Sequence, residues 1–240
     1  IHFIISACCT IASFLVIEQI IVDHLFVPRT KRIHLLLMVV FFCLLNHLFR
    51  EVHLGNINMI IVLLLSIALS LVLKSKSITT GFLLALVIIT KPYFIFFCFL
   101  PLLLHRKMKT ILFVIVFLLI FFVVPFVFVG FSKNISLHKE WLSAMFEHSN
   151  YLNSNHTIVS LIQFYFYPAI PYKITFYLIV FVGLLYIIYF WLNNQANNMN
   201  NNVSLMKNKS FIIQYFLLIA IVPNLLITDT EHFLFSLPLI

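Results

Sequence analysis

Hydrophobic positions along this chain are grouped into long runs, and short polar links separate the runs. A membrane-spanning helix needs about 20 mostly apolar residues. Several runs reach or approach that length, which predicts an all-α polytopic membrane protein with six full spans. The predicted spans cover residues 1–22, 33–49, 57–73, 111–131, 172–192 and 211–227.

A seventh run, residues 78–104, is interrupted by Lys91 and Pro92. A lysine at the centre of a membrane helix costs about 2.5–3.5 kcal/mol, and proline removes a backbone donor that the lipid cannot replace. The pair therefore predicts a break in the helix that is lined by protein or water, and it marks a candidate site.

Composition supports a membrane protein. Hydrophobic residues make up 63% of the chain and charged residues 9%, whereas charged residues are roughly a quarter of a soluble domain. The formal charge of +8 could suggest nucleic acid, but the basic residues lie in short links between spans, where membrane orientation explains them. The four cysteines lie in apolar runs without metal-ligand spacing. We expect no nucleic-acid partner, no metal and no cofactor.

The basic links favour a hairpin at the interrupted run. The positive-inside rule would place all four links in the cytoplasm, and two of them flank residues 78–104. A single crossing would put those two links on opposite faces. A re-entrant hairpin with arms 78–90 and 93–104 removes the conflict, and each arm would reach only about 18–20 Å. A single kinked span is the alternative. The links are Arg29/Lys31/Arg32, Lys74/Lys76, Arg106/Lys107/Lys109 and Lys207/Lys209.

We expect one membrane domain over residues 1–240, in a multi-pass protein of the cell membrane. The first residue is Ile and the last apolar run is short, so both ends are expected to be truncated. The long outer segment 132–171 carries aromatic residues that suit an element at the membrane interface. The Asn-rich segment 193–210 is expected to be a cytoplasmic linker.

Polar residues gather at the outer end of the second span, where residues 47–58 read HLFREVHLGNIN. Gly55 ends the helix, and Asn56 with Asn58 can hydrogen-bond at the start of the next one. The functional interpretation is a polar floor for a phosphate or sugar, with Arg50 offering a forked set of donors. The structural alternative is an ordinary polar turn with a capped helix.

Two further places have chemical potential. The ammonium of Lys91 could pair with the phosphate of a lipid carrier, and its structural alternative is a lysine snorkelling to the surface. Asp229, Glu231 and His232 lie in a polar stretch next to a span, and the alternative there is a short solvated loop.

Three stretches carry a resemblance: HLGNINMIIV at 53–62, GFLLALVIITKP at 81–92 and LPLLLHRK at 100–107. Together they resemble glycosyltransferase family 87, the polyprenol-phosphate-dependent hexosyltransferases that include mycobacterial mannosyltransferases. The family has a Gly-Gln-x-Asn turn, then a Gly-led span that reaches a Lys-Pro-like break. At the turn, Gly55 and Asn58 match the family pattern, whereas Asn56 replaces the usual Gln. Asn155-His156-Thr157 is similar to an Asn-Gln-Ser of the family, and His232 resembles a histidine that the family has late in its sequence.

The resemblance implies a GT-C fold and an inverting enzyme acting at the extracytoplasmic face. It would move a hexose, with mannose as the expected sugar, from a polyprenyl phosphate to a lipid or glycan acceptor. The general base of such enzymes is a carboxylate in the first outer loop, which would precede residue 1, so no catalytic base is assigned in this chain. The donor-site candidates are Arg50, His53, Asn56, Asn58, Lys91 and His232, with Glu51, Asn155, His156, Asp229 and Glu231 as secondary candidates.

Two other classes remain open at this point. A transporter or flippase for lipid-linked glycans could also use a broken hairpin with a buried charge, although carriers usually show internal repeats and no second Lys-Pro-like break is present. A polymerase or ligase for surface polysaccharide would use similar lipid-phosphate donors and would have a larger outer loop.

Overall fold

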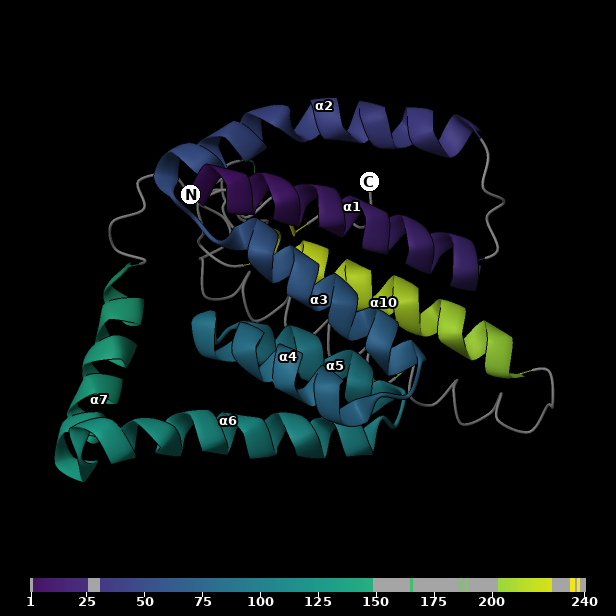
Figure 1. The fold of residues 1–240 in the computed structure, drawn as a ribbon. Coiled ribbons are helices and arrows are strands. Elements are labelled where there is room, and N and C mark those ends of the chain that lie inside the picture. The colour runs from purple at the N-terminus through teal and green to yellow at the C-terminus, as the bar shows by residue number, and fades with distance from the viewer. Residues whose placement is uncertain are drawn as a thin grey trace.

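The computed structural model describes residues 2–25, 31–148 and 203–225, together with Tyr165, Tyr186, Tyr189, Leu234, Phe235 and Leu237. Within these residues the fold is a bundle of helices without strands (Figure 1). Three helices are long and apolar enough to cross a membrane: Phe3–Leu25, Leu37–Leu54 and Met108–Val129. These observations confirm the predicted all-α membrane fold. The predicted span 172–192 lies outside the described residues, apart from Tyr186 and Tyr189.

The first three helices run back and forth along the bundle. Helix α1 (His2–Leu25) and helix α2 (Lys31–Leu54) are antiparallel, and helix α3 (Asn58–Leu73) packs beside α1 (Figure 1). The α3 helix has 16 residues, or about 24 Å at 1.5 Å per residue. It is therefore shorter than the full crossing expected from the sequence, because a hydrocarbon core is about 30 Å thick.

The Lys91-Pro92 run forms a hairpin. Helix α4 (Ser77–Thr90) and helix α5 (Phe94–Leu104) flank the break, and helix α6 (Met108–Val129) follows a short link. Phe82, near the start of α4, packs against Phe117 of α6 with ring centroids 5.4 Å apart. The starts of α4 and α6 are therefore neighbours, so α5 must return the chain to the end where α4 began (Figure 1). The hairpin prediction is confirmed, and the single kinked span is excluded.

A close approach of backbones holds α4 against α6. A Cβ atom added to Gly81 would lie 2.5 Å from the Cβ of Phe113 and 2.9 Å from its backbone carbonyl carbon. Only glycine leaves room for this contact, since real Cβ atoms do not approach other atoms so closely. The glycine at the start of the hairpin is thus explained by packing.

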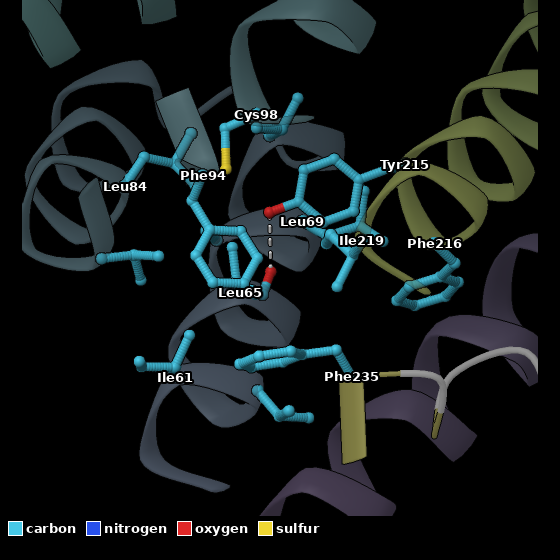
Figure 2. Close-up of a cluster of buried hydrophobic side chains, with 14 of the residues drawn as sticks. Ile61, Leu65, Leu69, Leu84, Phe94, Cys98, Tyr215, Phe216, Ile219 and Phe235 are labelled. Atoms are coloured by element: carbon cyan, nitrogen blue, oxygen red, sulfur yellow. Dashed lines mark hydrogen bonds between the residues drawn. The ribbon is translucent and has the colours of Figure 1, made fainter. Parts of the chain in front are cut away.

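Helix α10 (Val203–Leu225) closes the bundle against α5. At its centre the Tyr215 hydroxyl donates a hydrogen bond to the Leu65 carbonyl of α3 at 3.1 Å. Figure 2 shows this bond inside a cluster of apolar side chains that includes Phe94, Cys98 and Phe235. The core therefore sits where α3, α5 and α10 meet, beside the hairpin tip.

Two ends of the bundle differ in charge. The end where α2 and α10 begin, and where α3 turns into α4 and α5 into α6, is here called the basic end; the opposite end, with the hairpin tip and the α2–α3 turn, is called the site end (Figure 1). Helix α7 (Phe131–His148) leaves α6 at the site end and lies across it. The described positions at the basic end are Lys31, Arg32, Lys74, Lys76, Arg106, Lys107, Lys109, Lys207 and Lys209.

Candidate functional site

The site begins with the turn between α2 and α3. Gly55 has a positive φ of 68°, and its N–H donates to the Val52 carbonyl at 3.3 Å. The Asn56 N–H donates to the Glu51 carbonyl at 3.0 Å. This pair of bonds around a left-handed residue is the Schellman helix ending, which glycine favours because it has no Cβ. The turn brings the last residues of α2 close to the first residues of α3.

Glu51 is fully buried at this turn, and α3 takes up its carboxylate. One carboxylate oxygen accepts a hydrogen bond from Asn58 Nδ2 at 2.8 Å, and the other accepts the Met59 N–H at 3.1 Å. Met59 is in the first turn of α3, where backbone N–H groups have no partner in their own helix. A negative side chain is favoured there by the helix dipole. Glu51 therefore caps α3 from the neighbouring helix.

Lys91 connects the hairpin tip to this turn. Its ammonium donates a hydrogen bond to Asn58 Oδ1 at 2.6 Å, and the nitrogen lies 5.9 Å from the Tyr93 ring centroid and 5.5 Å from that of Phe235. The amide of Asn58 thus bridges a carboxylate and an ammonium. These three side chains, Glu51, Asn58 and Lys91, are called the polar trio below. Aromatic faces attract a cation, so the two rings add to the stabilisation of Lys91.

An apolar crevice of about 210 Å³ lies beside the trio, between the start of α1 and the end of α2. Glu51 contributes to its wall, while most other lining residues are aliphatic or aromatic. The full lining is Phe3, Ser6, Ala7, Thr10, Ile11, Phe41, Leu45, Leu48, Phe49, Glu51 and Val52.

The structure brings together only part of the predicted donor site. Asn58 and Lys91 meet as direct neighbours, although 33 residues separate them. Arg50 and His53 are at the same end of α2, but both side chains are exposed, and Asn56 is half-buried in the turn. The candidates His232, Asn155, His156, Asp229 and Glu231 lie outside the described residues.

The predicted capping of α3 by asparagines is wrong. The side chain of the N-cap residue Ile57 makes no bond to the helix, and the Asn58 amide is turned toward Glu51 and Lys91. The cap comes from the carboxylate of Glu51, which sequence reasoning ranked as secondary. The sequence did contain an indication of this role. Glu51 and Asn58 are seven residues apart, with the glycine turn between them, and this spacing allows the two side chains to contact each other.

Taken together, the site end presents a half-buried, hydrogen-bonded ammonium beside a capped helix start, and an apolar crevice whose wall includes Glu51. Such an arrangement can stabilise an anion, because preorganised cations and donors act strongly where water is scarce. The carboxylate of Glu51, linked to Lys91 through Asn58, partly balances the charge of the ammonium.

Comparison with known proteins assigns a family. The model of glycosyltransferase family 87 matches residues 1–209. The match covers α1 to α7 and the beginning of α10, and thus includes the whole polar trio. No curated protein and no solved structure matches the chain.

Proposed function

The chain belongs to glycosyltransferase family 87 and is a membrane glycosyltransferase; on that premise we propose that it transfers a hexose, with mannose as the first candidate, from a polyprenyl phosphate to a lipid or glycan acceptor. Transfer takes place at the site end, which faces the outside of the cell membrane. The observation that carries the proposal is Lys91 at the hairpin tip, held 2.6 Å from Asn58 at the end of the bundle opposite the basic links.

The chemistry of the leaving group supports this assignment. When the bond between sugar and phosphate breaks, the lipid phosphate gains negative charge, and a nearby ammonium stabilises that charge as it develops. The ammonium lies at the hairpin tip, at the end of the bundle opposite the basic links (Figure 1). The adjacent apolar crevice is consistent with a lipid-linked substrate.

The distribution of charge supports the orientation. The basic end collects lysines and arginines from several links, which the positive-inside rule assigns to the cytoplasm. The site end would then face outward, where the hairpin tip, α7 and the α2–α3 turn lie (Figure 1). Membership of the family favours a transferase over the carrier and polymerase alternatives.

The test is a transfer assay with the full-length protein in proteoliposomes, radiolabelled polyprenyl-phosphate mannose and candidate acceptors. We expect Lys91→Ala, and Lys91→Met with its apolar stem retained, to lower transfer by about tenfold to a hundredfold, the equivalent of one charge-assisted hydrogen bond. Insertion into the membrane should not change. The control is Lys76→Ala, which removes an exposed lysine at the basic end. Full transfer by both Lys91 variants would contradict the donor-site assignment.

A further inference from the structure

We propose that Glu51 is a positioning residue that fixes the orientation of the Asn58 amide, so that Asn58 holds the Lys91 ammonium in place for the donor phosphate. The inference rests on the proposed function, because Lys91 must contact the donor. It assigns to the carboxylate of Glu51 a role other than that of the general base.

The geometry of Glu51 supports positioning. The side chain is fully buried, and each carboxylate oxygen points at a protein donor, Asn58 Nδ2 at 2.8 Å and the Met59 N–H at 3.1 Å. A general base must come within hydrogen-bond reach of the hydroxyl from which it takes the proton. A carboxylate directed at two protein donors beneath the surface is poorly placed for that task.

The amide of Asn58 has two different ends, and only one orientation suits both neighbours. With its NH₂ group toward Glu51 and its carbonyl oxygen toward Lys91, each contact joins a donor to an acceptor. The reversed amide would place NH₂ against the ammonium and the oxygen against the carboxylate. The charge of Glu51 therefore selects the orientation that holds Lys91.

Glu51→Gln tests this selection. Glutamine offers one acceptor oxygen where two donors need acceptors. If that oxygen stays with the Met59 N–H, the new NH₂ group faces the NH₂ of Asn58, and the Asn58 amide turns over. Lys91 then loses the acceptor that Asn58 provides. We therefore expect the KM for the polyprenyl-phosphate sugar to rise about tenfold, and kcat to fall by less than that because the leaving phosphate is stabilised less well.

A matched control is Glu140→Gln. Glu140 is an exposed acid of α7, and its carboxylate accepts a hydrogen bond from Ser136 at 2.9 Å within the same helix. This variant removes a carboxylate at the site end without touching the trio. We expect its KM and kcat to equal those of the unmodified protein.

A double-variant comparison shows whether Glu51 acts through Asn58. Asn58→Leu should raise the KM for the donor, and adding Glu51→Gln to it should cause no further rise. If Glu51→Gln does not accumulate in membranes, Glu51→Gln combined with Asn58→Asp is used instead. In that exchange the amide introduced at position 51 can donate to the carboxylate introduced at position 58, which still accepts from Lys91. A KM close to that of the unmodified protein is therefore expected.

Four results would overturn the inference. Additive KM effects in the double variant would mean that Glu51 acts independently of Asn58. A fall in kcat by several orders of magnitude, with unchanged KM, would identify Glu51 as the base. If Glu51→Gln lowers the amount of active enzyme but leaves KM unchanged, the role of Glu51 is limited to capping α3. If Glu51→Gln combined with Asn58→Asp still has a high KM, the order of donors and acceptors in the trio does not matter for donor binding. The failure of the proposed function is distinguished from these by Lys91→Ala, since full activity of that variant removes Lys91 from the donor site.

Discussion

The charge of Lys91 is accommodated next to the apolar core because the Asn58 amide connects it to Glu51. Neither charged group is left alone: the carboxylate also caps α3, and two aromatic rings face the ammonium. Removing one partner of a buried charge pair costs about 3–5 kcal/mol, since the other charge stays behind without compensation. At the scale of single residues, the trio is therefore a unit in which a change at one member alters the interactions of the other two.

The order of donors and acceptors in the trio can be tested by stability. Asn58→Asp places a second carboxylate 2.8 Å from Glu51, in the position now held by the donor Nδ2, and the two negative charges repel each other. We expect the thermal midpoint in detergent to fall by at least about 4 °C. Adding Glu51→Gln restores a donor, so the exchange should recover most of the loss. A midpoint for the exchange below that of Asn58→Asp alone would contradict the hydrogen-bond order.

The sequence predicted Asn58 and Lys91 as site residues but not their contact with Glu51. Lysine and proline inside an apolar run are visible without a structure, because both are costly there. The direction of the Glu51 side chain depends on the Schellman turn at Gly55, which folds α3 back over the end of α2. Its meeting with Lys91 through Asn58 depends further on the packing of α4 against α3, which no local pattern contains.

At the scale of elements, the hairpin follows from charge and length. Basic links on both sides of the interrupted run required the chain to return, and the arms observed, α4 with 14 residues and α5 with 11, are close to the predicted ones. Partner choice among helices was not predictable in this way. The buried contact between His105, the C-cap residue of α5, and Gln214 of α10 is 2.8 Å long and joins residues 109 positions apart. It depends on complementary shapes that appear only after folding.

The contact between α4 and α6 predicts the effect of filling Gly81. In Gly81→Ala the new Cβ would meet the Cβ and the backbone of Phe113, so α6 must shift or both helices must strain. Overpacking of this kind costs about 1–3 kcal/mol, and we expect a lower thermal midpoint. The control is Thr79→Ala, which changes an exposed residue of the same helix and should have little effect. Equal midpoints for the two variants would show that α6 moves without cost.

At the scale of the whole molecule, the hairpin explains how one bundle separates its charges. Two helices of opposite direction lie between one basic link and the next from Lys31 to Lys109, so these links stay together at the basic end, and the lysine at the hairpin tip is carried to the opposite end (Figure 1). The same reversal brings Lys91 to the turn that carries Glu51 and Asn58. The separation of Lys91 from the basic links and the assembly of the polar trio are thus consequences of one structural feature.

Accessibility in intact cells tests this arrangement. In a background without the native cysteines, His53→Cys marks the site end and Lys76→Cys marks the basic end, and both positions are exposed in the bundle. A thiol reagent that cannot cross the membrane should label the first variant in intact cells and the second only after permeabilisation, because the positive-inside rule keeps the basic links in the cytoplasm. Labelling of both variants from outside would contradict the separation of the two ends. If only Lys76→Cys is labelled in intact cells, the orientation is the opposite of the one proposed, and Lys91 is on the cytoplasmic side.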